Sequence, residues 1–313
     1  MTENPDNMRL FWQFVYERQM VYHRRFERQD LPPWTQDQWL ANHHFCNVYR
    51  ELDRGTQYII GVLEAAATFG TPEDALWNIL VYRYFNAIPT FDFLRDGKPY
   101  LEWRTPWDHR DQAGYIKYWV NETGNQPFTG AFTVTGVKFG NYTDKVSNVC
   151  FLMELLQKKV PEIVVRLNNA PDFERAYHVF LGVDGFGRFL GFQVAVDWAY
   201  YDPRLDRNSF AEAGPGCING LKWLYPGIRG VKSYHLAIHS LADSQQSYFQ
   251  QYDLAFPYWQ NKTIVASDIE NCLCEFSKYM RMRTGQRPDG SVVRGGGRTR
   301  NFNAFSRIQP ALI

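Results

Sequence analysis

The segment from residue 182 to residue 187, Gly-Val-Asp-Gly-Phe-Gly, could bind a phosphate group. It separates two segments with helical patterns, and Gly185 and Gly187 would let the chain approach a ligand closely. The second helix would begin at this turn, so its free N–H groups would point outward there, beside the positive charge of Arg188. The alternative is an ordinary tight turn between two helices.

A second glycine-rich turn, Ala213-Gly-Pro-Gly216, leads into another predicted helix. Pro215 has no N–H to donate, but the turn from Gly214 to Gly216 and the amides after it could still bind an anion. The alternative is the plain start of a helix. The sequence contains no Gly-x4-Gly-Lys-Ser/Thr motif, so we expect no P-loop.

Four cations and one amide side chain are candidates for neutralising a phosphate group. Arg50 and Arg54 are four residues apart in a segment with a helical pattern, so we expect them to share one helical face, which Asn47 joins. Arg83 and Lys278 lie in two other segments with helical patterns. The alternative role of Arg50 and Arg54 is a salt bridge with Glu51, Asp53 or other acids.

Two carboxylates are candidates for accepting a proton from a reacting group. Asp197 lies late in an otherwise apolar helical segment, where a charge without a partner is costly. Glu275 lies one helical turn after Asn271 and three residues before Lys278. The alternative for Asp197 is a structural role, as a cap or in an ion pair with an arginine.

The amino-acid composition argues against a disordered chain and against a membrane-spanning protein. The chain has 313 residues, 45% of them apolar and 17% aromatic, which excludes a disordered chain. No apolar run reaches the ~18 residues that a membrane span needs, and the polar N-terminus does not resemble a secretory signal. Five scattered cysteines indicate reduced thiols, so we expect a cytoplasmic protein without a membrane partner.

Two further groups of residues have possible roles. His235, His239 and Asp243 would share a helical face and could bind a metal, but a half-buried histidine pair is the commoner outcome, so we expect no metal. From Lys278 onward the chain has eight Lys or Arg residues and one acid, Asp289. This basic segment is typical of either a polyanion-binding arm or a solvated tail.

The elements that position these candidates are expected to be helices. Apolar and aromatic residues recur at helical spacing, and Thr71 followed by Pro72 marks one helix start. Residues 96–145 are harder to assign, and residues 128–136 could form a short strand pair or an irregular loop. The segments with helical patterns include 8–28, 39–54, 71–84, 144–159, 171–181 and 188–200, and the segment around Cys272 and Cys274 also reads as a helix.

The order of these segments predicts the fold class. The sequence has no internal repeat, no Gly/Ser linker and no alternation of strands and helices, so we predict a mainly α fold with a small irregular or β insertion. Residues 1–285 are expected to form a single helical domain, with lobes of about 1–165 and 166–285 as an alternative. Residues 286–313 are expected to form a basic C-terminal arm.

Six segments resemble one protein family in their residues and their order. They are Phe45-Cys-Asn-Val-Tyr-Arg-Glu-Leu-Asp-Arg54, Tyr82-Arg-Tyr-Phe-Asn86, Phe128-Thr-Gly-Ala-Phe132, Phe192-Gln-Val-Ala-Val-Asp197, Ala213-Gly-Pro-Gly216 and Asp268-Ile-Glu-Asn-Cys-Leu-Cys-Glu-Phe-Ser-Lys-Tyr-Met-Arg281. The family is that of the bacteriophage α-glutamyl/putrescinyl thymine pyrophosphorylases, also called amino acid:DNA transferases. Its helical module is also fused to some hydroxymethyl-deoxyuridine DNA kinases. The resemblance spans roughly residues 10–285.

The resemblance implies a fold and a reaction. The implied fold is that of the DNA glycosylases, in which a helix-hairpin-helix element grips a DNA phosphate. In thymidine hypermodification, a kinase converts hydroxymethyl-deoxyuridine in DNA to a pyrophosphate ester, and the transferase displaces pyrophosphate with an amine, often that of an amino acid such as glycine. The implied partners are double-stranded DNA carrying a modified thymine and a free amino acid or other amine. We expect no cofactor, and a monomer in the host cytoplasm.

The candidate residues could meet the physical demands of this reaction. Cations and amides would stabilise the departing pyrophosphate, a carboxylate would accept the proton of the amine, and the base would be flipped out of the duplex. We expect pyrophosphate binding by Asn47, Arg50, Arg54, Arg83, Gly214, Gly216 and Lys278, proton transfer by Asp197 and Glu275, and DNA binding by Gly185, Gly187 and Arg188.

Two other functions remain open. A DNA glycosylase could use the same scaffold, with Asp197 or Asp206 as its acid, and would release a free base instead of pyrophosphate. A non-catalytic partner of a separate hydroxymethyluracil DNA kinase would bind modified DNA and release no pyrophosphate.

Overall fold

The computed structural model describes residues 2–129 and 142–293, and it confirms the prediction of a mainly α fold. Within these ranges no strand forms, apart from one isolated bridge between Gln286 and Val292. Most of the insertion expected at residues 128–136, and most of the arm expected at residues 286–313, lie outside the described residues. None of the helices in the described ranges has the length and apolar character needed to cross a membrane.

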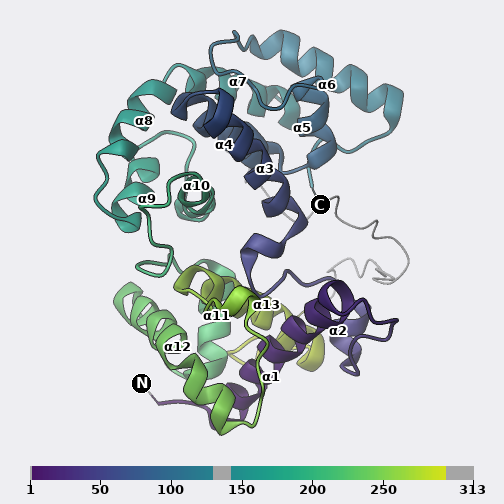
Figure 1. The fold of residues 1–313 in the computed structure, drawn as a ribbon, viewed down its shortest axis with the longest axis vertical. Helices are drawn as coiled ribbons and strands as arrows, with labels where there is room; N and C mark the ends of the chain where they lie inside the picture. The colour runs from purple at the N-terminus through teal and green to yellow at the C-terminus, as the bar shows by residue number, and fades with distance from the viewer. Residues whose placement is uncertain (1, 130–141, 294–313) are drawn as a thin grey trace. The chain divides into compact units, whose positions relative to one another are not determined.

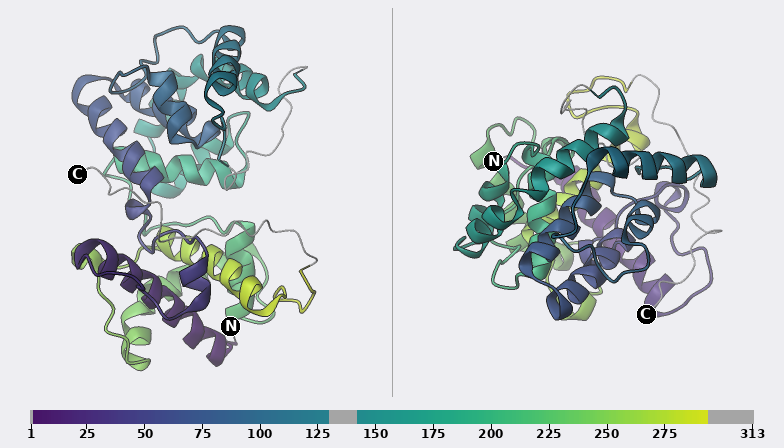
Figure 2. Two further views of the ribbon diagram at one scale, coloured as in Figure 1. Left: turned by 90° about the vertical axis from the view of Figure 1, so that its right-hand side faces the viewer. Right: turned by 90° about the horizontal axis from the view of Figure 1, so that it is seen from above.

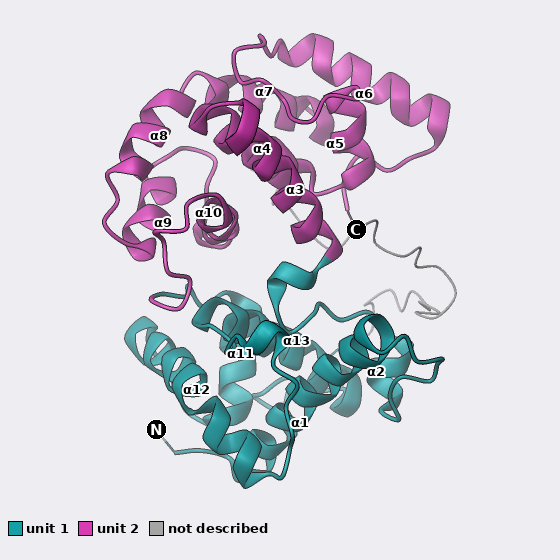
Figure 3. Ribbon diagram, in the orientation of Figure 1, with its two compact units in different colours: residues 1–53, 210–313 teal, residues 54–209 magenta. Residues whose placement is uncertain are grey.

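The described residues form two compact units, which have different colours in Figure 3. Unit 1 comprises the described residues within 1–53 and 210–313, and unit 2 comprises those within 54–209. The boundaries therefore differ from the lobes of about 1–165 and 166–285 considered above. The physical reason is that helices from the two ends of the sequence pack against each other in unit 1.

Unit 1 is organised around its last helix. The elements are α1 (Pro5–Tyr22), a π-helical turn η1 (His23–Glu27), α2 (Gln38–Asn42), the 3-10 turn η2 (Arg50–Leu52), α11 (Pro215–Leu224), α12 (Val231–Gln251), the 3-10 turn η3 (Trp259–Asn261) and α13 (Ala266–Thr284). α13 packs against α1, α2, α11 and α12, as Figures 1 and 2 show. At Gly220 the backbones of α11 and α13 are so close that a Cβ atom would overlap the carbonyl of Leu273.

Aromatic side chains join these helices in the core of unit 1. Trp12 of α1 stacks on Tyr248 of α12, with ring centres 5.3 Å apart, and meets Phe249 edge-on at 4.9 Å. Phe11 of α1 meets Phe276 of α13 edge-on at 5.3 Å. Such pairs add to the burial of the rings themselves, so the N-terminal helix is an integral part of this core.

Unit 2 contains two helices that are buried along most of their length. Its elements are α3 (Arg54–Phe69), α4 (Pro72–Phe85), α5 (Ile88–Arg95), α6 (His109–Thr123), α7 (Lys145–Gln157), α8 (Val160–Asn168), α9 (Phe173–Leu181) and α10 (Arg188–Tyr201). Residues 74–85 of α4 and 190–199 of α10 are all buried, which is typical of helices that are apolar all round. Thr71 caps α4 in a capping box with Asp74, and so confirms the predicted helix start.

The continuous helix expected over residues 39–54 is wrong. α2 ends at Asn42, and the chain is not α-helical again until α3 begins at Arg54. Arg50 starts the short turn η2, and Asp53 after it is extended. Arg50 and Arg54 therefore lie on different elements, and the expectation that they share one helical face is also wrong.

Polar side chains explain why this segment is not a continuous helix. The Asn47 side-chain amide donates to the Leu52 carbonyl at 2.7 Å, and the Asn47 N–H donates to the Asp53 carboxylate at 2.8 Å. Side chains that bond the nearby backbone compete with the hydrogen bonds of a helix. The segment instead folds back on itself as a compact loop.

Candidate functional site

Residues 44–49 of unit 1 form a loop whose backbone is held by side chains from distant parts of the sequence. Arg18 of α1 is buried, and it donates to the carbonyl of Cys46 at 3.0 Å and to that of Asn47 at 2.9 Å. Because one rigid guanidinium bonds two successive carbonyls, it fixes the course of the chain between them. We refer to residues 44–49 as the clamped loop.

Three side chains of α13 hold the clamped loop from the other side. Asn271, Glu275 and Lys278 are spaced by four and three residues, so they lie on one face of the helix. Asn271 donates to the Asn47 carbonyl at 3.4 Å, Glu275 accepts from the Cys46 N–H at 3.4 Å, and Lys278 donates to the His44 carbonyl and lies over the Phe45 ring. The predicted site residues Asn47, Glu275 and Lys278 are therefore brought together, in contacts that order this loop.

The clamped loop leads into η2 and so places Arg50 beside acids. The Arg50 N–H donates to the Asp268 carboxylate at 3.2 Å, and the Arg50 side chain is buried. Burial raises the pKa of Asp53 to about 6, against the opposing effects of the Asn47 N–H and the Arg50 charge. Arg50 therefore interacts with a carboxyl group, that of Asp53, whose charged form is disfavoured by burial.

Glu270 of α13 is a second acid in unit 1 whose pKa is raised by burial. Its side chain is 5% exposed, and one carboxylate oxygen accepts the Gly214 N–H at 3.3 Å. Burial raises its pKa to about 7; Arg50 and the Gly214 N–H oppose this rise, and the charge on Glu212 adds to it. A carboxyl group with a pKa near neutrality can both accept and return a proton under physiological conditions.

The two glycines predicted to bind pyrophosphate have other contacts in this region. The Gly214 N–H already donates to Glu270. A Cβ atom at Gly216 would overlap the sulfur of Cys274, so this glycine lets α11 approach α13 closely. The close packing of α11 on α13 is a sufficient reason for glycine at 216, and a direct role of either residue in binding stays a prediction.

Sequence reasoning missed the acids around Arg50. Asp268 and Glu270 lie inside the segment from 268 to 281 that carries part of the family resemblance, but only the fold shows that they are buried beside Arg50. Glu212 gave no signal, because it precedes the glycine turn without any motif of its own. We refer to Arg50, Glu212, Gly214 and Glu270 as the Arg50 site.

In unit 2, Arg83 of α4 and Asp197 of α10 form a buried ion pair. Arg83 Nη2 lies 2.5 Å from Asp197 Oδ1, and Arg83 Nε bonds the other oxygen. Although burial lowers the pKa of Arg83, the charge and hydrogen bonds of Asp197 raise it above its usual value. The structure therefore contains the ion pair considered as the alternative role of Asp197, while its role as a base stays a prediction.

The turn between α9 and α10 presents its second half to solvent. Gly185 has a φ of +103°, and its carbonyl accepts the Tyr84 hydroxyl at 2.8 Å, which ties the turn to α4. Nothing lies within 4 Å of the position of a Cβ atom at Gly187, and Arg188 is exposed. No side chain caps the start of α10. The three residues predicted to bind DNA thus lie together at one turn.

The cations predicted to bind pyrophosphate fall into two groups. Arg50 and Lys278 belong to unit 1, whereas Arg54 and Arg83 belong to unit 2. Arg54 is exposed at the start of α3, and its charge opposes the effect of burial that raises the pKa of Tyr82 to about 12. Of these four cations, Arg54 is the one whose side chain is exposed.

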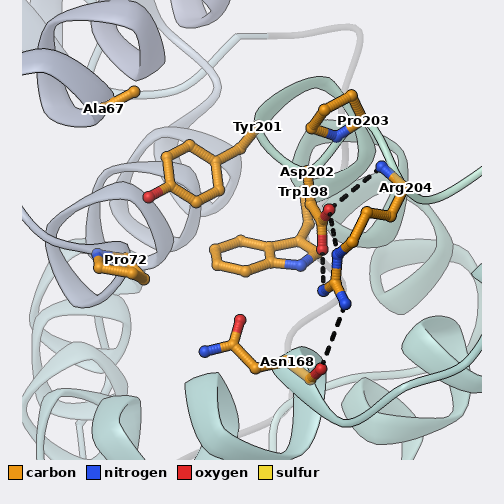
Figure 4. Close-up of a pocket in the computed structure, with 8 residues that line it drawn as sticks. All are labelled: Ala67, Pro72, Asn168, Trp198, Tyr201, Asp202, Pro203 and Arg204. Carbon is orange, nitrogen blue, oxygen red and sulfur yellow. Dashed lines mark hydrogen bonds and ion pairs between the residues drawn. The ribbon is translucent and has the colours of Figure 1, made fainter.

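Unit 2 also contains an open cleft of about 440 Å³, which Figure 4 shows in close-up. The rings of Trp198 and Tyr201, with centres 4.9 Å apart, lie among its walls. Arg204 pairs with Asp202 through two contacts of 2.9 and 2.6 Å, and donates to the Asn168 carbonyl at 3.4 Å. The Trp198 side chain is fully buried, so the half-buried Tyr201 is the aromatic residue that offers surface to this cleft, beside the Arg204–Asp202 ion pair.

The histidines considered as metal ligands lie on α12. The ring of His235 packs edge-on against Phe210, with centres 5.0 Å apart. In the part of the chain that the structure describes, no three His, Cys, Asp or Glu side chains are grouped as metal ligands would be.

Comparisons with known proteins point to one family. The family model described as "5-hmdU DNA kinase, helical domain" matches residues 6–287. A curated relative, the 5-hmdU DNA kinase of Bacillus phage SP10, is 24% identical over 310 residues, which cover 92% of this chain and 47% of the relative. The chain thus spans about half the length of the curated relative it matches. No solved structure matches the chain.

Proposed function

Because this chain belongs to the family of 5-hmdU DNA kinase helical domains, we propose that it acts in the hypermodification of thymidine in phage DNA as an amino acid:DNA transferase. Its substrate is pyrophosphoryloxymethyl-deoxyuridine in double-stranded DNA. An amine, with glycine favoured, attacks the exocyclic methylene carbon. The C–N bond forms, the C–O bond breaks, and pyrophosphate leaves with the bonding electron pair; no cofactor is needed.

The family match over residues 6–287 carries this proposal. The family model describes a helical domain, and the six segments that resemble the transferases lie within the residues that it matches. A kinase reaction of the P-loop type has no support in the 313 residues, because they contain no Gly-x4-Gly-Lys-Ser/Thr motif.

We assign DNA binding to the turn that contains Gly185, Gly187 and Arg188, as the hairpin of a helix-hairpin-helix in a glycosylase-like fold. The positive φ of Gly185, the open space at Gly187 and the uncapped start of α10 support this assignment. The exposed guanidinium of Arg188 supplies a positive charge at the same place. Double-stranded DNA would then be held through its backbone, independently of sequence.

We assign pyrophosphate stabilisation and proton transfer to the residues expected from the sequence. Arg54 is exposed and can contact a phosphate directly, whereas Arg50, Arg83 and Lys278 are engaged with other groups of the protein. Asp197 and Glu275 are the expected acids, but Arg83 occupies Asp197 and the clamped loop occupies Glu275. These engagements favour Arg54 as the first cation to test.

The proposal is tested with a duplex that carries pyrophosphoryloxymethyl-deoxyuridine and a panel of amino acids and polyamines. We expect release of one pyrophosphate per modified base and a nucleoside mass that matches the addition of one amine, most efficiently glycine. Release of the free base, which leaves an abasic site in the duplex, would show a glycosylase instead. Hydrolysis of the ester without a new C–N bond would also contradict the proposal.

A non-catalytic DNA-binding partner is the second candidate. The observation in its favour is that the matched relative is named a DNA kinase, and that the match covers 47% of it. Such a partner would bind the modified duplex tightly and release no pyrophosphate with any amine. Adding this chain to a separate 5-hmdU DNA kinase would then raise the activity of that kinase on the duplex above that of the kinase alone.

A further inference from the structure

The part of unit 1 from residue 213 to residue 242 contains cations and no acids. Its three cations are Lys222, Arg229 and Lys232, and it has no aspartate or glutamate. All three side chains are exposed, and none of them forms an ion pair with the residues that the structure describes. Because unpaired surface cations attract anions over several ångströms, this region favours an anionic partner.

The three cations are carried by one turn and the helix ends beside it. Residues 225–230 join α11 to α12, two helices that Figure 1 labels. Lys222 lies in the last turn of α11, Arg229 in the connecting turn, and Lys232 in the first turn of α12. Ile228 is buried, and its N–H donates to the Tyr225 carbonyl at 3.0 Å, so the turn is anchored to the core of unit 1.

The main chain of this turn is accessible. Gly227 and Gly230 are exposed and have φ values of +86° and +89°. Nothing lies within 4 Å of the position of a Cβ atom at either residue. Glycines in such a conformation let another molecule approach the backbone closely, so the surface beside the cations is open to a partner.

Lys232 is at an unfavourable position for a cation. The start of a helix has a partial positive charge, because its first N–H groups have no partner within the helix. α12 has neither a side-chain cap nor an acid in its first turn, so no residue at the start of this helix offsets the repulsion of Lys232. A negatively charged partner would stabilise both the side chain and the helix start.

Glu3 is an acid that interacts with the base of this turn. Its charge adds to the effect of burial, which raises the pKa of Tyr225 above its usual value. Its carboxylate is already engaged, since it accepts the Tyr248 hydroxyl at 2.8 Å. Even when Glu3 is counted, the turn and its flanking helix ends keep an excess of positive charge.

We propose that Lys222, Arg229 and Lys232 form a surface of unit 1 that binds the phosphate backbone of duplex DNA. This inference rests on the proposed function, whose substrate is duplex DNA, and adds a contact to the one assigned to the turn in unit 2. The cations belong to the end of α11, the turn and the start of α12, so they are spread over a surface. A row of phosphates can contact all three, whereas a single small anion would contact fewer. Contacts of this kind hold the duplex independently of its base sequence.

The test is fluorescence anisotropy of the full chain with a DNA duplex without modified bases, at several salt concentrations. The triple variant Lys222→Gln, Arg229→Gln, Lys232→Gln should weaken binding about tenfold or more at low salt. The slope of log Kd against log salt should fall by about three in the triple variant and by about one in each single variant, as expected for one lost phosphate contact per cation. Urea unfolding checks that the triple variant is as stable as the unmodified protein.

A matched triple variant separates this surface from a general effect of net charge. Lys98→Gln, Arg104→Gln, Arg110→Gln removes the same charge from exposed positions of unit 2, and should leave affinity and slope unchanged. Equal losses in the two triple variants would overturn the proposed surface. So would failure of the unmodified protein to bind the duplex.

Transfer to pyrophosphorylated DNA is measured in parallel, so that the surface and the function can fail separately. Binding that depends on the three cations, without transfer by the unmodified protein to any amine, supports the surface and overturns the function. Transfer by the unmodified protein, with undiminished DNA binding when the three cations are replaced, supports the function and overturns the surface.

Discussion

Arg83 on α4 and Asp197 on α10 lock two buried helices of unit 2 together through a bidentate ion pair, with both side chains shielded from solvent. Asp197, the acid in an otherwise apolar helical segment, thus has a partner more than a hundred positions earlier in the chain. Removing one partner of such a pair leaves an uncompensated buried charge.

We predict that Asp197→Asn lowers the free energy of unfolding by about 3–5 kcal/mol, because Arg83 remains charged and buried. The double variant Arg83→Met, Asp197→Leu should recover most of this loss, since it removes both charges. Urea unfolding followed by circular dichroism measures both effects. A folded, equally stable Asp197→Asn protein that has lost transfer would instead identify Asp197 as the catalytic base.

Glu270 should make stability fall as pH rises. The unfolded glutamate loses its proton near pH 4.5, and the folded one near pH 7, so the folded protein binds more protons between these values. The free energy of unfolding should therefore decrease from about pH 4.5 to about pH 7 and stay lower above, by at most about 3 kcal/mol. The groups that face Glu270 are Arg50 on η2, Glu212 and Gly214 before α11, Cys217 on α11 and Cys274 on α13.

Glu270→Gln should flatten this part of the pH profile and raise stability at pH 8 relative to the unmodified protein. Asp53, whose pKa burial raises to about 6, acts in the same direction and should leave a smaller residual slope. Chemical unfolding at pH 5, 6, 7 and 8 measures the change. An unchanged slope in the Gln variant would show that Glu270 does not titrate in this range.

Gly220→Ala should destabilise unit 1, because its Cβ atom would overlap the Leu273 carbonyl where α11 meets α13. We expect a loss of about 3 kcal/mol or more, since the obstacle is backbone and cannot turn away. Gly61→Ala on α3 is the matched control: nothing lies within 4 Å of its Cβ position. That substitution should raise stability by about 0.5–1 kcal/mol. Equal effects of the two substitutions would contradict the close approach of the helices.

Arg188→Ala should weaken binding of duplex DNA and reduce the dependence of log Kd on log salt by about one unit, as expected for the loss of one phosphate contact. Arg175→Ala, at an exposed position in the first turn of α9, is the control and should change neither quantity. Fluorescence anisotropy at several salt concentrations measures both. The same loss in the two variants would indicate a general effect of net charge and not a contact at the turn.

Local patterns in the sequence were enough to predict several of the helices, one in unit 1 and four in unit 2. α1, α4, α7, α9 and α10 lie where apolar periodicity and helix-start signals place them, and these signals depend on neighbours only a few residues away. The segment 39–54 failed because Asn47 and Asp53 look compatible with a helix until their bonds to the backbone are known.

The partners of the candidate residues could not be predicted in the same way. Glu275 and Lys278 bond a loop about 230 residues away in the chain, and Glu270 meets Arg50 over a similar separation. Such contacts depend on how α13 is placed against the N-terminal segment, which no local pattern reports. The sequence showed which residue types were present, but not that Arg50, Asp268 and Glu270 are all buried in the fold.

The clamped loop is recognised through its main-chain atoms, at the carbonyls of His44, Cys46 and Asn47 and the N–H of Cys46. Main-chain atoms are the same for every residue type, so exchanges of side chains in the loop leave these bonds possible. The number of residues is a different matter. Inserting or deleting a single residue between Cys46 and Arg50 would change the distance along the chain between them by several ångströms, about the length of one residue of extended chain. Arg50 would then move relative to the side chains of α13 that hold the loop. Length, more than composition, is therefore the property of this loop that evolution would have to preserve.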